Sequence, residues 1–183
     1  NNRRIQSALH WRQLIKKVRG QYDGILTYAA NFDNYFEVEF WDELDFIGIN
    51  AYFGLRQAYQ KYENDAQFLE LMKKGWDAAF EDINTFRRQQ QLISKPLLFT
   101  ELGYINRKGC TVQPWQGFGY SVVGYSYYES LIRWTKEPYN YQERTLAMQA
   151  LYDVVNEQNI NLEGILYWKL TSHDYHLPYE PFA

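Results

Sequence analysis

The chain has 183 residues, of which 46% are hydrophobic and 22% are charged, and this globular composition excludes a disordered chain. A formal net charge of −3 without a basic block argues against nucleic acid and anionic membrane surfaces as partners, and no run of about 18 apolar residues could cross a bilayer. The single cysteine excludes an internal disulfide framework and a cysteine-based zinc site, whereas the 19% of aromatic residues favours a binding surface built from rings.

The first predicted elements are a helix and two strands. Residues 6–19 carry one apolar stripe at helical spacing, and Gly20 follows as a stop signal. Residues 24–30 form a continuous apolar run, which predicts a buried strand. A second such strand is predicted at residues 44–50, after a charge-rich stretch at residues 37–43 that we interpret as solvent-exposed.

A long helix and a third strand follow. The helix is predicted at residues 65–91, and Asn64 and Gln67 have capping-box spacing at its start. The strand covers residues 96–100 and begins with a proline, at the strand position where a missing N–H donor is tolerated. A long loop is predicted from residue 101 to about residue 139.

The chain continues with a helix at residues 141–158, capped by Asn140 and Glu143, and a strand at residues 163–168. Apolar strands that alternate with helices indicate an α/β fold with a parallel sheet covered by helices. A doubly wound sheet usually has a glycine-rich phosphate loop after its first strand, and this sequence has none there. The alternative is a (β/α)₈ TIM barrel, which needs about 250 residues. The four predicted strands fit half a barrel, so we expect residues 1–183 to be one part of a larger domain.

Polar and aromatic side chains lie at the predicted carboxyl ends of the strands, where parallel α/β folds place their functional residues. In chain order they are Tyr28, Asn31, Asn50, Tyr52, Glu101 and Trp168. One carboxylate with amides, phenols and an indole suits a sugar, because rings stack on pyranose faces and amides bind hydroxyl groups.

Four of these residues also have a structural explanation. Glu101 is either a catalytic carboxylate or a capping or ion-paired glutamate, and its position alone does not decide between them. Trp168 could belong to the core instead of a sugar platform. Asn31 and Asn50 could simply terminate strands, which is a common role of asparagine.

No metal ion and no cofactor are predicted. His173 and His176 have the spacing of two metal ligands, but no third ligand is evident, so we interpret them as part of a solvated loop. Cys110 has no neighbouring histidine, which argues against a nucleophilic thiol.

Several segments, in the same order along the chain, resemble the later half of glycoside hydrolase family 113. They are residues 11–19, Leu26-Thr27-Tyr28-Ala29-Ala30-Asn31, residues 40–52, residues 95–104 and Gly164-Ile165-Leu166-Tyr167-Trp168. The resemblance covers roughly residues 8–175 and is weakest in the loop at residues 105–140. It implies a retaining β-mannanase-like hydrolase with a (β/α)₈ barrel, of which this chain carries strands five to eight.

The resemblance also implies roles for individual residues. In that clan of glycosidases the acid/base glutamate ends strand four and the nucleophile ends strand seven, so Glu101 takes the nucleophile position and the acid/base falls just before Asn1. Tyr52 or Asn50 would orient Glu101 or the sugar 2-hydroxyl, and Trp168 would form the floor of the cleaved sugar's site. The remaining cleft residues would be Tyr28, Asn31, Tyr104 and Trp115.

The implied substrate is a β-linked oligo- or polysaccharide such as β-1,4-mannan, and the implied partner of this chain is the N-terminal half of the same domain. The family resemblance favours a secreted, periplasmic or cell-surface location. The alternatives are a non-catalytic carbohydrate-binding protein and a structural half-barrel that binds no sugar. A half-barrel would expose two sheet edges. We therefore expect the isolated chain to aggregate, to dimerise or to be covered by another segment.

Overall fold

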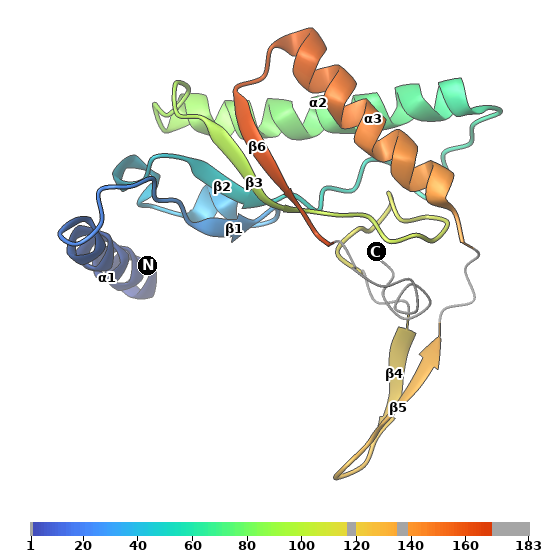
Figure 1. Cartoon of the computed structure of the whole chain (residues 1–183), viewed down its shortest axis with the longest axis horizontal. Coiled ribbons are helices and arrows are strands. Elements are labelled where there is room, and N and C mark those ends of the chain that lie inside the picture. Colours follow the sequence, from blue (N-terminus) through green and yellow to red (C-terminus); the bar gives the residue numbers. More distant parts are fainter. Residues whose placement is uncertain (1, 117–119, 135–138, 170–183) are drawn as a thin grey trace. The chain divides into compact units, whose positions relative to one another are not determined.

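The computed structural model describes residues 2–116, 120–134 and 139–169 (Figure 1). The described residues group into two compact units that interleave along the chain. The first unit is built from the chain up to Ala51 together with Glu81–Glu101 and Asn161–Leu166, and the second unit contains the remaining described residues.

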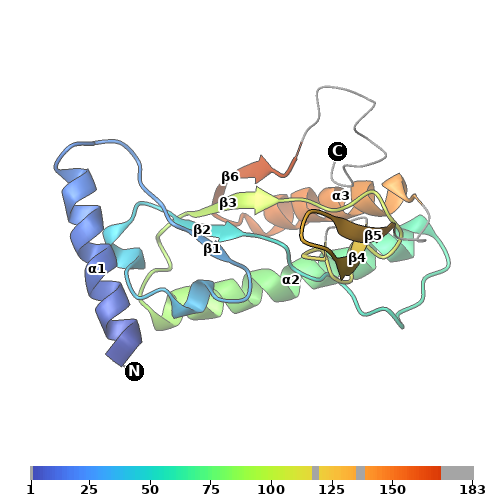
Figure 2. The ribbon, with the colours of Figure 1, turned by 90° about the horizontal axis from the view of Figure 1, so that it is seen from below.

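A four-stranded sheet organises the first unit, with the order β1-β2-β3-β6. Its strands are β1 (Ala29–Asn31), β2 (Ile47–Asn50), β3 (Leu97–Leu102) and β6 (Leu162–Tyr167). β1 pairs with β2, and β2 with β3, in parallel. The Leu97 N–H donates to the carbonyl of Asn161 and the Trp168 N–H to that of Leu102, so β6 is also parallel to β3 (Figure 2). The predicted α/β fold with a parallel sheet is confirmed.

Apolar side chains of the central strands form the core of the first unit. Ile47 and Ile49 of β2 and Leu97 and Phe99 of β3 are completely buried. Burial of a large aliphatic or aromatic side chain contributes about 1.5–3 kcal/mol, which is why such runs form central strands.

Helix α1 (Asn2–Arg19) belongs to the same unit and is tied to the segment before β2 by ion pairs. Two short 3-10 turns, η1 (Tyr35–Glu37) and η2 (Trp41–Glu43), lie in the connection from β1 to β2. Arg12 pairs with Asp42 at 2.6 Å and with Glu43 at 2.8 Å. The charge-rich stretch, interpreted as solvent-exposed, therefore also binds α1.

The first strand is shorter than predicted. Residues 24–30 were expected to form it, but β1 covers only Ala29–Asn31. The reason is local: the Leu26 N–H donates to the Asp45 carboxylate at 2.7 Å, and the Leu26 carbonyl accepts from the Asp45 N–H at 2.9 Å. These backbone groups are satisfied by a loop residue and make no strand ladder.

Two helices dominate the second unit. α2 (Asp65–Gln89) contributes its residues up to Phe80, and α3 (Tyr141–Gln158) lies wholly in this unit. The buried Trp76 indole donates to the carbonyl of Ala147 at 3.1 Å. None of the described helices combines the length and the apolar character that a bilayer span requires.

The caps predicted for α2 and α3 are both present, whereas α1 begins at Asn2 and not at the predicted residue 6. Asn64 accepts the Gln67 N–H at 3.0 Å, and Asn140 accepts the Glu143 N–H at 3.1 Å. These bonds satisfy N–H groups that the first turn of a helix leaves without an intrahelical partner. α3 ends at Gln158 and is capped by Asn159, which takes the left-handed conformation with φ 50°.

The prediction of one long loop from residue 101 to about residue 139 is wrong, because this segment contains a hairpin. β4 (Tyr120–Tyr125) and β5 (Ser130–Trp134) pair antiparallel (Figure 1). The turn is closed by Ser126 and Glu129, whose backbone groups bond at 2.7 Å. The β-branched and aromatic residues on either side of this turn have high strand propensity.

Candidate active site

One carboxylate and two amides lie in a row across three neighbouring strands. Asn31 of β1 is the register partner of Asn50 of β2, and Asn50 is the register partner of Glu101 of β3. Because the strands are parallel, all three residues lie toward the carboxyl ends of their strands. The sequence predicted these three residues at strand ends, and the register places them side by side.

The row depends on an irregularity in β3. Ile49 pairs with Phe99, but the next residue, Asn50, pairs with Glu101, so Thr100 is the extra residue of a β-bulge. The Thr100 hydroxyl donates to Asn50 Oδ1 at 2.9 Å, and Asn50 Nδ2 donates to Asn31 Oδ1 at 3.2 Å. Thr100 was absent from the predicted site, since no local pattern announces a bulge.

Backbone hydrogen bonds fix the row in place. The Glu101 carbonyl accepts from the Ala51 N–H at 2.7 Å, and the Asn50 carbonyl accepts from the Phe32 N–H at 3.1 Å. Glu101, Asn50 and Thr100 are half-buried and Asn31 is exposed. A partly exposed carboxylate beside positioned amides can approach a polar ligand and hydrogen-bond to its hydroxyl groups.

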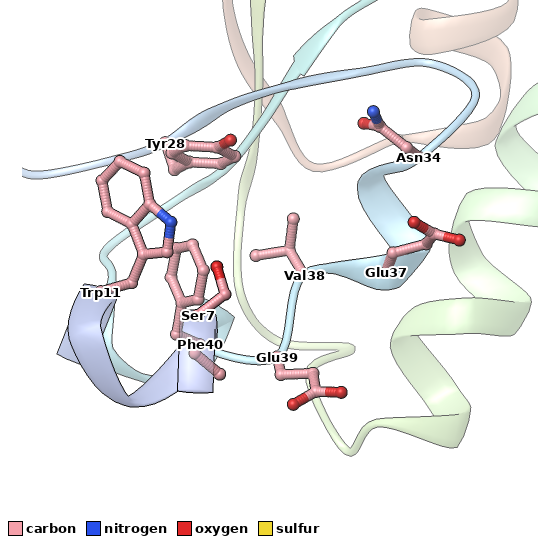
Figure 3. A pocket seen from close by; sticks show the side chains of 9 residues that line it. Ser7, Trp11, Tyr28, Asn34, Glu37, Val38, Glu39 and Phe40 are labelled. Atoms are coloured by element: carbon pink, nitrogen blue, oxygen red, sulfur yellow. The ribbon is translucent and has the colours of Figure 1, made fainter. Parts of the chain in front are cut away.

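Tyr28 lines a hollow of about 190 Å³ in the same unit (Figure 3). Its ring contacts Trp11 of α1 edge to face at a centroid distance of 5.0 Å, and Phe40 stacks on Trp11 at 5.5 Å. Asn34 lines the hollow and also accepts the Asn31 N–H at 3.0 Å, which connects the hollow to the end of β1. Aromatic walls with polar groups at the rim suit a sugar ring.

Four of the predicted sugar-binding residues belong to the second unit: Tyr52, Tyr104, Trp115 and Trp168. Tyr52 is half-buried, and Trp115 and Trp168 are 46% and 43% exposed. Trp115 lies beside the segment after β2, with a ring atom 3.6 Å from where a Cβ on Gly54 would stand. The peptide bond between Trp168 and Lys169 is cis.

Tyr104 does not fit the predicted role. It is completely buried, and desolvation raises the pKa of its hydroxyl well above the ordinary value. The described structure therefore places this ring in the core of the second unit, away from any accessible cleft surface.

A buried ion pair in the second unit was missed by the sequence reasoning. Arg56 Nη2 donates to Glu143 Oε1 at 2.9 Å, and the Thr111 hydroxyl donates to the same oxygen at 2.6 Å. The Glu143 carboxylate also accepts the Gly109 N–H at 2.8 Å. These residues are far apart in sequence, so no spacing pattern could have indicated the cluster.

The described residues contain no group of three or more His, Cys, Asp or Glu side chains arranged to hold a metal ion. His173 and His176 lie outside the described residues. Cys110 is buried, and desolvation raises the pKa of its thiol, which disfavours the nucleophilic thiolate.

Comparison with protein families matches residues 3–155 to Glycoside Hydrolase Family 113. Among proteins with curated functions, none matches the chain.

Solved structures of similar fold include several of that family. A GH113 β-1,4-mannanase is 22% identical, with 97% of this chain and 46% of its own chain covered and a TM-score of 0.64. A GH113 β-1,4-mannanase complex is 20% identical, with 94% and 45% covered and a TM-score of 0.62. The GH113 β-mannanase AaManA from Alicyclobacillus acidocaldarius in complex with ManMIm is 20% identical, with 94% and 44% covered and a TM-score of 0.59. The chain thus shares their fold and spans about half their length.

Proposed function

Because the chain belongs to glycoside hydrolase family 113, we propose that it forms the later half of the catalytic barrel of a retaining enzyme that hydrolyses β-linked glycans such as β-1,4-mannan. The single observation that carries the catalytic assignment is the register of Glu101 with Asn50 and of Asn50 with Asn31. In parallel α/β enzymes, catalytic groups come from neighbouring strand ends of this kind.

In this mechanism Glu101 is the nucleophile. Its carboxylate attacks the anomeric carbon while the bond from that carbon to the leaving oxygen breaks, and a second carboxylic acid protonates this oxygen. Water then attacks the glycosyl-enzyme, the second carboxylate takes the water proton, and Glu101 leaves as a carboxylate. The two carboxyl groups need a separation of about 5–5.5 Å, and we propose that the second one lies outside these 183 residues.

Asn50 and Asn31 would bind the sugar beside Glu101. The Asn50 amide is oriented by bonds at both of its ends, since Oδ1 accepts from Thr100 and Nδ2 donates to Asn31. A fixed amide costs little reorganisation when charge develops on the sugar in the transition state. Tyr28, Tyr52, Trp115 and Trp168 supply the rings of the proposed binding surface, and Trp168 is proposed as the floor of the cleaved sugar's site.

The test replaces the carboxylate with its isosteric amide. In the protein of full natural length, Glu101→Gln should reduce hydrolysis of β-1,4-mannan, measured by the release of reducing ends, by about a thousandfold or more. Glu163→Gln is the matched control, because Glu163 is an exposed glutamate on the neighbouring strand β6. Hydrolysis by Glu101→Gln at the rate of this control would refute the assignment.

A chemical experiment examines the same residue independently. A 2-deoxy-2-fluoro-β-mannoside with an activated leaving group should leave a sugar covalently attached to Glu101, because fluorine slows the hydrolysis of the intermediate. Peptide mass spectrometry after proteolysis locates the adduct. A label on another carboxylate would transfer the nucleophile role to that residue.

A second candidate function is carbohydrate binding without catalysis. It is favoured by the row of amides at the strand ends and the aromatic hollow around Tyr28, which would be sufficient to bind a sugar without cleaving it. Manno-oligosaccharide binding by calorimetry, together with no mannan hydrolysis by the full-length protein, would support this alternative. Absence of both binding and hydrolysis would leave a structural role.

A further inference from the structure

A pocket of about 600 Å³ lies within the second unit, and its lining shares no residue with the polar row or with the hollow of the first unit. Its walls come from the segment at residues 56–62, which follows β2 in the chain, and the segment at residues 108–112, which follows β3. Both segments therefore belong to connections that leave the carboxyl ends of strands. Such connections carry substrate-binding residues in parallel α/β enzymes.

The buried ion pair fixes the two walls to each other. Arg56 lines the pocket, its side chain is 7% exposed, and its Nε donates to Thr111 Oγ1 at 2.9 Å. The Thr111 carbonyl in turn accepts the Leu55 N–H at 2.8 Å. The Gly109 N–H is held by Glu143 at 2.8 Å. The backbone of both walls is therefore positioned without any ligand.

The rest of the segment at residues 56–62 is also ordered. The Gln57 N–H donates to Gln60 Oε1 at 2.7 Å, which closes a turn. The ring of Tyr62 stacks on Phe68 with a centroid distance of 3.7 Å and an interplanar angle of 7°. A preformed pocket loses less conformational entropy when it binds a ligand than a flexible loop does.

The charge of the pocket is positive. Among the described residues that line it, Arg56, Lys61 and Lys108 are basic and none is acidic. The ion pair with Glu143 compensates the charge of Arg56, so the net positive charge of the pocket comes from Lys61 and Lys108. Both lysines are exposed, and neither takes part in the ion pairs of the described residues. A neutral sugar gains little from two ammonium groups, whereas an anionic group gains a charge-assisted hydrogen bond from each.

We propose that this pocket binds an anionic substituent, a carboxylate or a sulfate ester, carried by the glycan. Lys61 and Lys108 bind the anion, and Tyr62 and Gln60 contact the sugar that bears it. The inference rests on the proposed function in one respect, that the ligand is a glycan. It adds that the substrate is an acidic or acid-decorated polysaccharide.

Two trisaccharides that differ only at C6 test this assignment. β-1,4-mannotriose carries hydroxymethyl groups there, and β-1,4-trimannuronate carries carboxylates. Calorimetric titrations use the full-length protein with Glu101→Gln, so that neither probe is consumed. Trimannuronate should bind about tenfold more tightly at low salt, and the advantage should shrink at about 0.5 M NaCl because salt screens exposed charges.

Variants locate the effect. Lys61→Gln and Lys108→Gln should each weaken trimannuronate binding about threefold, and the double variant should bind both probes equally. Lys17→Gln, on the exposed surface of α1, is the matched control and should keep the tenfold preference. Equal binding of the two probes by the unmodified pocket, or an undiminished preference in the double variant, would overturn the proposal.

Sodium sulfate alone distinguishes a glycan subsite from a general anion site. Weak or undetectable binding of free sulfate supports the subsite, whereas affinity equal to that of trimannuronate overturns it. The result is separable from the proposed function. Lysine-dependent preference without hydrolysis of either mannan or an acidic mannan would refute only the enzyme, and mannan hydrolysis without the preference would refute only the subsite.

Discussion

The side chain of Glu143 holds several separate segments of the second unit together. Its carboxylate is completely buried and accepts hydrogen bonds from Arg56, Thr111 and Gly109. Its own N–H is accepted by Asn140 at the start of α3. One glutamate therefore joins a helix start, the segment after β3 and the segment after β2. A buried carboxylate is tolerated only when its charge and lone pairs are matched in this way.

We predict that Glu143→Gln lowers the free energy of unfolding by about 3–5 kcal/mol, because it leaves the buried Arg56 charge without a counter-charge. Urea denaturation followed by circular dichroism measures the change. The double variant Glu143→Gln/Arg56→Met removes both charges and should recover part of the loss. Equal stability of Glu143→Gln and the natural sequence would show that the ion pair contributes nothing to stability.

At the scale of elements, α2 contains a glycine where helices usually disfavour one. A Cβ on Gly75 would stand 2.2 Å from the Leu55 carbonyl oxygen and 2.6 Å from its Cα. Both neighbours are backbone atoms, so the segment that leads into Arg56 would have to move. The glycine thus allows a close approach that its helix propensity alone would not favour.

Gly75→Ala should therefore destabilise the protein by about 1–3 kcal/mol, although alanine gains about 1 kcal/mol of helix propensity. Lys74→Ala at the adjacent exposed position is the control and should stay within about 0.5 kcal/mol of the natural sequence. Thermal and urea unfolding report both changes. A stabilised Gly75→Ala variant would contradict the close approach.

The elements that the sequence predicted best have local signals at their ends. α3 was predicted at residues 141–158 and lies there, since Asn140 caps its start and Asn159 terminates it. β1 was predicted too long, because the competing bonds between Leu26 and Asp45 join residues 19 positions apart. The hairpin did have a local signal, namely strand-forming residues on both sides of Ser126 to Glu129, which the assumption of one long loop concealed.

At the scale of the whole molecule, stability should depend on pH through the ion pairs that bind α1. The hydrogen bond from Arg12 holds the pKa of Asp42 below its ordinary value, and the hydrogen bond from Arg19 does the same for the pKa of Asp45. A carboxylate whose pKa is lowered by folding stabilises the native state above its unfolded pKa of about 3.9. This stabilisation is lost as the pH falls from about 5 through the lower, folded values.

Each exposed pair contributes about 0.2–1 kcal/mol, so the expected loss between pH 6 and pH 3 is small but measurable by urea unfolding. The variant Arg12→Met/Arg19→Met should show a flatter pH profile than the natural sequence. Carboxylates that pair with neither arginine are common to both proteins, so the difference between the two profiles tests the ion pairs of Arg12 and Arg19. Identical profiles would exclude these ion pairs as a source of acid sensitivity.

The residues of the candidate sites also differ in how well the sequence predicts them, depending on whether a local pattern or a contact between distant residues places them. Glu101, Asn50 and Asn31 could be predicted because each follows or ends an apolar run, and parallel strands align their carboxyl ends. Arg56 could not be predicted, since its partners Thr111 and Glu143 lie 55 and 87 positions away. Tyr104 lies shortly after Glu101 in the chain, so the sequence suggested an accessible ring at this position. The structure shows instead that Tyr104 is completely buried.

The bulge at Thr100 has a consequence for how this strand can change in evolution. Without the bulge, Asn50 would face Thr100 and Glu101 would face Ala51. If Thr100 itself were deleted, a regular ladder would still place Glu101 opposite Asn50, but the hydroxyl that donates to Asn50 Oδ1 would be lost. The bulge therefore places both Thr100 and Glu101 beside Asn50, which a regular ladder could not do. The sequences of relatives should be aligned at this strand by matching the bulge and its hydrogen bond, and not by counting residues along the strand.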